Sequence, residues 1–156
     1  MSSILLVEDS PLDAEMVIDA LADHNLTNEI IHLRDGAEAL DYLYHRGPFA
    51  DRTPGHPGVV LLDLKMPKVD GLDVLRTIKA DSELKMIPVV VMTSSREEQD
   101  VVRSYDLGAN AYVVKPVGFQ DFVDAVKQVG GFWAFLNHRP ADKPRGGSPS
   151  ISTEVE

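Results

Sequence analysis

The chain contains no cysteine, which excludes disulfide bonds and metal sites built from thiolates. It has no cluster of lysine and arginine, and its formal net charge of −10 argues against direct contact with a nucleic-acid backbone. No apolar run approaches the ~20 residues of a membrane-spanning helix. No basic segment of a secretory signal peptide precedes the first apolar residues. We therefore expect a cytoplasmic protein that binds neither nucleic acid nor a membrane directly.

Apolar residues are plentiful, since they make up 44% of the 156 residues, enough for the core of one ordinary domain. Residues 137–156 are almost free of them, so we predict one domain over 1–136 and a flexible tail over 137–156. The segment 47–58 holds three prolines and three glycines and is predicted to be a long loop without regular structure. The five histidines show no spacing typical of metal ligands, and we interpret them as ordinary residues.

Short apolar segments alternate with helix-like ones along the domain. The clearest is Val59–Leu62, which is followed by Asp63 and soon afterwards by Pro67 and Gly71. A continuous apolar run bounded by turn residues is typical of a strand buried on both faces. The whole pattern predicts strands at 3–7, 29–33, 59–63, 87–93 and 111–114, and helices at 11–24, 37–47, 72–81, 97–107 and 119–136. Strict alternation of this kind predicts an α/β fold with helices on both faces of a parallel sheet.

Polar residues end four of these strands, namely Glu8 with Asp9, Asp63, Thr93 and Lys115. The carboxyl ends of parallel strands share one edge of the sheet, where ligands bind in open α/β folds. Carboxylates this close repel one another unless one is protonated or a cation binds, and an oxygen-rich site suits Mg²⁺ or Mn²⁺. A carboxylate beside a metal ion, a hydroxyl and an ammonium group is what an aspartyl-phosphate requires. The sequence therefore predicts phosphoryl transfer to Asp63.

Each of these residues also has an ordinary explanation. Asp9 and Asp63 could cap a turn or a helix, Thr93 could be a turn residue, and Lys115 could be solvated. Their common position at four strand ends would then be a coincidence, so we retain the interpretation as one site.

Four segments resemble the receiver domain of two-component response regulators. They are Leu5-Leu6-Val7-Glu8-Asp9-Ser10, Leu61-Leu62-Asp63-Leu64-Lys65-Met66-Pro67-Lys68-Val69-Asp70-Gly71, Val91-Met92-Thr93-Ser94 and Val114-Lys115-Pro116. The resemblance covers residues 3 to about 130. It implies a flavodoxin-like doubly wound (βα)5 fold, whose five-stranded parallel sheet has the order 2-1-3-4-5. It also implies a phosphoacceptor switch that catalyses its own phosphorylation and slow autodephosphorylation, with a sensor histidine kinase as the donor.

The resemblance assigns roles to the acidic residues. Asp63 would accept the phosphoryl group, while Asp9 and Asp63 would bind Mg²⁺ together with the backbone carbonyl of Lys65. Glu8 would hold a metal-bound water, at a position where the family more often has Asp. Lys65 and Ser95 occupy positions at which the family tunes autodephosphorylation, and we expect Lys65 to prolong the lifetime of the phosphorylated state.

The resemblance also assigns the switch. Thr93 would hydrogen-bond the phosphoryl group and move toward it, and Lys115 would pair with a phosphoryl oxygen. Tyr112 would turn inward when Thr93 moves, which shifts the population toward an active arrangement. A cis peptide bond would join Lys115 and Pro116.

The predicted last helix carries an apolar stripe made of Phe122, Val126, Val129, Trp133 and Leu136. Such a stripe ordinarily packs on the sheet, but its end lies past the expected edge of the sheet, which favours a partner surface. We therefore predict a homodimer through this helix. Because about 20 mostly polar residues follow it, we expect a single-domain regulator with a downstream protein partner. The Gly130-Gly131-Phe132-Trp133 ending resembles small regulators paired with bacterial phytochrome-type kinases.

Three other classes of protein share part of this pattern. A haloacid-dehalogenase-type phosphatase needs a second carboxylate two residues after the nucleophile, where this chain has Lys65. A flavodoxin-type electron carrier needs a phosphate-binding loop rich in serine, threonine and glycine after the first strand, where this chain has Glu8-Asp9-Ser10-Pro11. A metal-free pseudo-receiver that acts only as an interaction module remains the alternative, although it usually lacks an acidic residue or the lysine.

Overall fold

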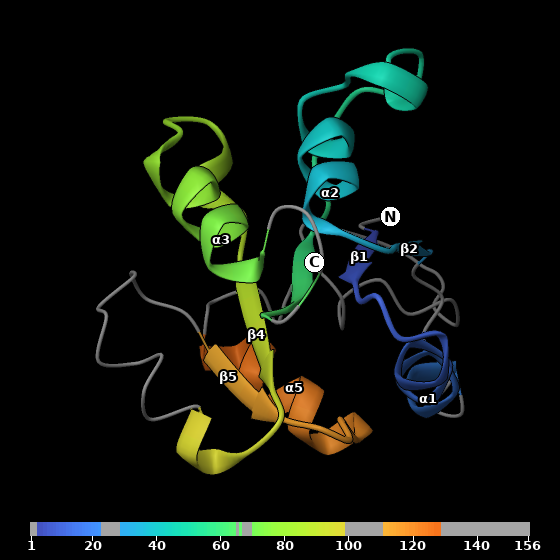
Figure 1. The fold of residues 1–156 in the computed structure, drawn as a ribbon, viewed down its shortest axis with the longest axis vertical. Coiled ribbons are helices and arrows are strands. Elements are labelled where there is room, and N and C mark those ends of the chain that lie inside the picture. Colours follow the sequence, from blue (N-terminus) through green and yellow to red (C-terminus); the bar gives the residue numbers. More distant parts are fainter. Residues whose placement is uncertain (1–2, 23–28, 65, 67–69, 99–110, 129–156) are drawn as a thin grey trace, which may run out of the picture.

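The sheet contains five parallel strands, in the order β2-β1-β3-β4-β5 (Figure 1). The computed structural model describes residues 3–22, 29–64, 66, 70–98 and 111–128. The strands are β1 (Ile4–Val7), β2 (Ile30–Leu33), β3 (Val59–Asp63), β4 (Val89–Thr93) and β5 (Ala111–Val114). The predicted α/β class and the predicted strand order are both confirmed.

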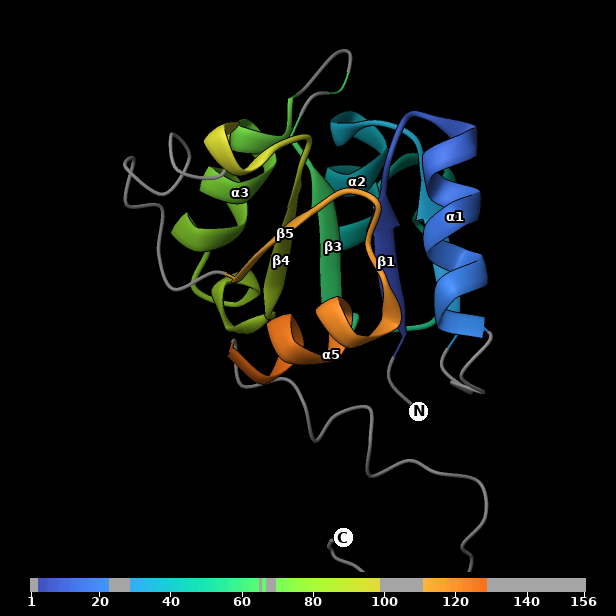
Figure 2. The ribbon, with the colours of Figure 1, turned by 90° about the horizontal axis from the view of Figure 1, so that it is seen from below.

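Helices cover both faces of the sheet. The α-helices are α1 (Pro11–Ala22), α2 (Gly36–Leu43), α3 (Gly71–Ala80) and α5 (Phe119–Gln128), and the 3-10 turns are η1 (Gly47–Phe49) and η2 (Leu84–Met86). Figure 1 shows α2 and α3 on one side of the sheet, and Figure 2 is seen from the side of α1 and α5. No helix in the described part of the chain has the length and apolar character needed to cross a membrane.

The three inner strands β1, β3 and β4 are buried on both faces, as their continuous apolar runs predict. In β3, Val60 and Leu62 pack toward α2 and α3, whereas Val59 and Leu61 pack toward α1 and α5. All four side chains are fully buried. This two-sided burial fixes the register of β3 and leaves Asp63 as its last residue, at the carboxyl edge.

One prediction for the loop 47–58 is wrong, because η1 forms a 3-10 turn at its start. Arg52 organises this segment through its side chain. Its Nε donates to the carbonyl of Tyr42 at 2.8 Å, and its guanidinium lies 3.9 Å from the centre of the Tyr42 ring. The side-chain contacts of one arginine thus give order to a segment whose prolines and glycines suggest none.

The prediction of a partner surface on the last helix is wrong for two of its five residues. Phe122 and Val126 are each 2% exposed and pack in the core of the chain itself, against β-strand residues and α1. An apolar stripe at helical spacing is the same whether it faces a core or a partner, and here these two residues face the core. Val129, Trp133 and Leu136 lie outside the described residues, as do most of the predicted helix 97–107 and the predicted tail 137–156.

Candidate functional site

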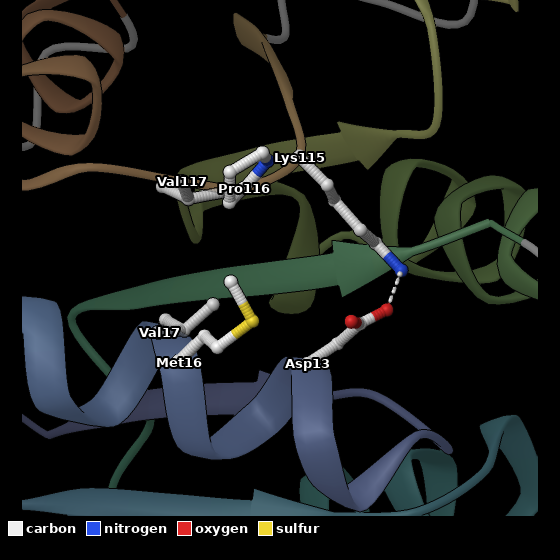
Figure 3. A pocket seen from close by; sticks show the side chains of 6 residues that line it. All are labelled: Asp13, Met16, Val17, Lys115, Pro116 and Val117. Atoms are coloured by element: carbon white, nitrogen blue, oxygen red, sulfur yellow. Dashed lines mark hydrogen bonds and ion pairs between the residues drawn. The ribbon is translucent and has the colours of Figure 1, made fainter.

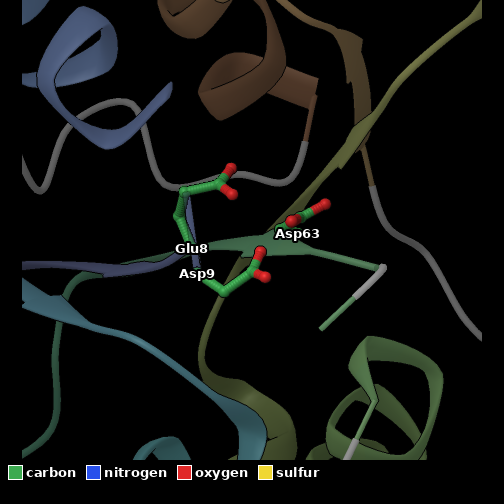
Figure 4. Close-up of side chains that lie close together, drawn as sticks. All are labelled: Glu8, Asp9 and Asp63. Carbon is green, nitrogen blue, oxygen red and sulfur yellow. The ribbon is translucent and has the colours of Figure 1, made fainter. Parts of the chain in front are cut away.

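Three carboxylates converge at the carboxyl edge of the sheet (Figure 4). Glu8 and Asp9 follow β1, and Asp63 ends β3 next to it, because β1 and β3 are neighbours in the sheet. One oxygen from each carboxylate can be chosen so that all lie within 4.8 Å of one another. Glu8 and Asp63 are buried, at 1% and 5% exposure, whereas Asp9 is exposed. These hard oxygen donors, open to solvent on one side, fit a divalent ion such as Mg²⁺ or Mn²⁺.

The position of Glu8 is fixed by contacts from three directions. Its backbone N–H donates to the carbonyl of Leu33 at 3.0 Å, and Nε2 of His32 donates to its carbonyl at 2.8 Å. Its Oε2 accepts from the backbone N–H of Ser10 at 3.1 Å. Neither the main chain nor the carboxylate of Glu8 can therefore turn away from the site without breaking a hydrogen bond. The role of His32 was missed from the sequence.

Lys115 follows β5 and is held there by its backbone. Its N–H donates to the carbonyl of Thr93 at 2.9 Å, and the bond that joins it to Pro116 is cis. The side chain of Lys115 runs back across the end of β3 toward α1 (Figure 3). The residue is thus directed into the edge of the sheet at which the carboxylates lie.

The ammonium group of Lys115 contacts three carboxylates. Its Nζ lies 2.8 Å from Oε1 of Glu8, 3.3 Å from Oδ1 of Asp63 and 3.3 Å from Oδ2 of Asp13. Glu8, Asp63 and Lys115 are the residues that the sequence placed here, whereas Asp13 was missed. A signal for Asp13 exists, because the first turn of a helix that follows a strand lies at the same edge of the sheet.

For both Glu8 and Lys115, burial and the contact between the two residues shift the pKa in opposite directions. Burial raises the pKa of Glu8 to about 7, with a smaller contribution from the nearby charge of Asp63, although the contact with Lys115 acts in the other direction. Burial lowers the pKa of Lys115, but the contacts with Glu8 and Asp63 outweigh burial and the pKa is raised overall. Lys115 is therefore a permanent cation, and Glu8 is a carboxylate whose ionisation is unfavourable without a further cation.

In metal-free protein, Glu8→Gln is expected to raise the melting temperature more at about pH 8 than at about pH 5.5. The pKa of Glu8 lies near 4.5 in an unfolded chain and near 7 in the folded protein. Between these two pH values, the folded protein keeps a proton on Glu8 that the unfolded chain releases. Glu8 therefore contributes less stability as the pH rises from about 4.5 to about 7, and glutamine removes this loss. Thermal unfolding in the presence of a chelator measures the effect, with the exposed Glu15→Gln as control. An equal shift at both pH values would contradict the assignment.

Thr93 ends β4 and is fully buried. Its hydroxyl donates to the carbonyl of Val113 on β5 at 3.2 Å, so a hydrogen bond to a ligand at Asp63 requires this one to be given up. Tyr112 on β5 is half-buried and packs against the core beneath α2 and α3. Thr93 therefore lies on the strand next to β3, whereas Tyr112 lies on β5, one strand further from Asp63.

Of the two residues expected to modulate rate, only Ser95 is described. Its Oγ accepts from the backbone N–H of Glu98 at 3.1 Å, while Oε1 of Glu98 accepts from the N–H of Ser94 at 2.8 Å. The Ser95 hydroxyl thus caps the start of the helical residues 96–98, and the Glu98 carboxylate binds the residue that precedes the cap. Ser95 thus has a structural role in addition to the one implied by its position, and Lys65 lies outside the described residues.

Known proteins match the chain over most of its length. The response regulator Rcp1 from Synechocystis sp. is 42% identical over 130 residues, which cover 83% of this chain and 87% of that protein. The solved structure of the bacteriophytochrome response regulator AtBRR is 58% identical, with a TM-score of 0.84, and the match covers 88% of this chain and 98% of that one. The phosphorylated cyanobacterial phytochrome response regulator RcpA is 41% identical, with a TM-score of 0.67, and the match covers 85% and 94%.

A family model agrees with these matches and with the site. The model of the response regulator receiver domain matches residues 4–127, which include every strand and every α-helix of the structure except the last residue of α5. The sheet order and the carboxylates at its edge are those that the sequence resemblance implied. The chain therefore belongs to the family of response regulator receiver domains.

Proposed function

We propose that the chain is a single-domain, cytoplasmic response regulator that accepts a phosphoryl group on Asp63 from a sensor histidine kinase, in a reaction that depends on Mg²⁺. The observation that carries the proposal is the arrangement around Asp63. Its carboxylate lies beside those of Glu8 and Asp9, and Oδ1 lies 3.3 Å from Nζ of Lys115. A nucleophile, a donor set for a cation and a fixed ammonium group thus meet at one edge of the sheet.

In the proposed step, a carboxylate oxygen of Asp63 attacks the phosphorus atom of a phosphohistidine. The new oxygen–phosphorus bond forms as the phosphorus–nitrogen bond breaks, and the electron pair remains on the imidazole of the kinase. Lys115 neutralises charge on the phosphoryl oxygens from one side. A bound Mg²⁺ would supply further positive charge, held by Asp9, Asp63 and the backbone carbonyl of Lys65, with Glu8 acting through a water.

Two relatives support the choice of cofactor and modification. A solved structure of Rcp1, with 41% identity to this chain and a TM-score of 0.66, is described as its Mn²⁺-bound form. RcpA, at 41% identity, is described as phosphorylated. The corresponding oxygen donors in this chain have the hardness that both Mg²⁺ and Mn²⁺ prefer.

The proposed output is a conformational switch. When a phosphoryl group is present on Asp63, the hydroxyl of Thr93 leaves the carbonyl of Val113, 3.2 Å away, and donates to a phosphoryl oxygen instead. Tyr112, which borders a hollow of about 400 Å³ lined by Asp121 and Asp124, then repacks inward. The surface of β5 and α5 changes shape, and a downstream protein reads the change.

The partners are proposed from the relatives and from the apolar stripe of the predicted last helix. Likeness to a bacteriophytochrome response regulator at 58% identity favours a phytochrome-type kinase as the phosphoryl donor. A homodimer remains proposed for the receiver domain 1–136, and its contacts would come from Val129, Trp133 and Leu136, since the other two residues of the stripe are buried. Residues 137–156 would remain a flexible tail. A phosphorylation-independent pseudo-receiver is the second candidate, and the complete acidic set with Lys115 argues against it.

Phosphoryl transfer from a kinase tests the proposal. A phytochrome-type kinase is labelled with ³²P on its histidine, purified and mixed with the chain in Mg²⁺. The label is expected to move to the wild type and to stay on the kinase when Asp63→Asn is used. Asp70→Asn, an exposed aspartate that caps α3, serves as the matched control and should accept the label. Transfer to the Asp63→Asn protein would contradict the assignment of the acceptor.

A further inference from the structure

Among the described carboxylates around Lys115, Asp13 is the one that the proposed phosphoryl chemistry leaves without a role. It lies in the first turn of α1, where its backbone N–H donates to Oγ of Ser10 at 3.2 Å. Its Oδ2 accepts a hydrogen bond from Nζ of Lys115 at 3.3 Å (Figure 3). The two residues are 102 positions apart in the sequence, so the fold, and not local structure, brings them together.

An ammonium group has three N–H donors. In this structure three carboxylates surround that of Lys115, at 2.8 Å for Glu8 and 3.3 Å for Asp63 and Asp13. The contact with Asp13 is a hydrogen bond, whereas those with Glu8 and Asp63 are ion pairs. A phosphoryl group on Asp63 brings new anionic oxygens, and these oxygens compete with the present partners for the ammonium group of Lys115.

The three partners differ in what their release would cost. The Glu8 side chain is 1% exposed, and its other oxygen accepts from Ser10, so it cannot turn out into water. Asp63 carries the phosphoryl group itself. The Asp13 side chain is 40% exposed and stands on a helix turn that faces solvent, so water can replace Lys115 around it. Asp13 is thus the partner that is released at the lowest cost.

We propose that Asp13 is a positioning residue for Lys115, which it holds at the α1 side of the site until a phosphoryl oxygen takes its place. The inference rests on the proposed function. Asp13 has two opposing effects in this scheme, because it keeps the ammonium group near the site but also competes with the phosphoryl group for it. Since Glu8 and Asp63 still hold Lys115 when Asp13 is removed, competition is the larger effect.

Asp13→Asn is therefore expected to bind beryllofluoride, a mimic of the phosphoryl group, about two- to fivefold more tightly than the wild type does. This is the change expected for one partly exposed ion pair. Asparagine keeps the size of the side chain, and the N–H bond to Ser10 belongs to the backbone, so the start of α1 is preserved. Asp13→Glu restores a carboxylate and should bind beryllofluoride as the wild type does.

Calorimetric titration of full-length proteins with beryllofluoride in Mg²⁺ gives the affinities. Asp19→Asn is the matched control, because it removes the same charge from the same helix at an exposed position. It should change the affinity less than twofold, as expected for a screened surface charge. A second readout needs no ligand: in metal-free protein, the NMR signals of the Lys115 ε-methylene should shift in Asp13→Asn and remain unchanged in Asp19→Asn.

Tighter binding in Asp13→Asn, together with the shifted Lys115 signals, would support the inference. Weaker or equal binding, or the same tightening in Asp19→Asn, would overturn it while leaving the proposed function intact, provided that the wild type binds beryllofluoride and Asp63→Asn does not. A wild type that binds no beryllofluoride in Mg²⁺ would overturn both the proposed function and the role of Asp13.

Discussion

Replacing Gly71 with alanine is expected to lower the free energy of unfolding by about 3 kcal/mol, the upper end for overpacking of a tight site. A Cβ atom at this position would lie 2.4 Å from the carbonyl oxygen of Asp63 and 2.5 Å from Cα of Leu64. Both are backbone atoms, so no rotation of a side chain can relieve the contact. Gly71 also donates from its N–H to the carbonyl of Leu64 at 2.9 Å, which ties the start of α3 to the end of β3.

The same substitution should weaken metal binding, because the main chain that must move carries Asp63. Urea unfolding measures the loss of stability, and the rise in melting temperature with Mg²⁺ reports the site. Gly118→Ala is the matched control, since its Cβ would meet only a side-chain oxygen of Asp121, at 3.5 Å. Equal and small effects of the two substitutions would show that the close approach of α3 to β3 does not constrain the site.

The second large effect is expected for Lys115→Met, which keeps a long, unbranched side chain but removes the charge. At about pH 8 without metal, we expect a loss of about 3 kcal/mol in the free energy of unfolding, near the lower end for breaking a buried ion pair. The reason is that Glu8 and Asp63, at 1% and 5% exposure, lose their cation. The loss of stability is limited because Glu8, whose pKa lies near 7, can take up a proton.

A double-mutant cycle separates this charge effect from lost packing. Adding Glu8→Gln to Lys115→Met removes one of the uncompensated charges, so most of the lost stability should return. Saturating Mg²⁺ should reduce the cost of Lys115→Met in the same way, because the ion provides a replacement for the missing positive charge. Strict additivity of Glu8→Gln and Lys115→Met in chemical unfolding would contradict an electrostatic role for the pair.

Much of the fold follows from features that the sequence displays directly. The continuous apolar run of β3 predicted burial on both faces, and the structure splits its residues between the two cores. The polar residues after four strands predicted a common edge, because all parallel strands end there. Glu8, Asp63 and Lys115 meet as a consequence of this topology, and no local contact is needed to bring them together.

Other features could not be read from the pattern, for physical reasons. The contact of Asp13 with Lys115 depends on the orientation of two side chains that are far apart in the sequence. The contact of His32 with Glu8 depends on the register between β1 and β2. The hydrogen bond from Thr93 to Val113 depends on a single side-chain rotation. The burial of Phe122 could not be separated from a partner contact, since both require the same apolar face.

The central claim is that Asp63 accepts a phosphoryl group with the help of a divalent ion. The most direct test is the intact mass of the chain after incubation with acetyl phosphate and Mg²⁺, beside Asp63→Asn and a metal-free sample. We predict a gain of one phosphoryl group in the wild type with Mg²⁺ and no gain in either control. A gain that persists in Asp63→Asn, or a wild type that gains nothing with Mg²⁺, would contradict the account.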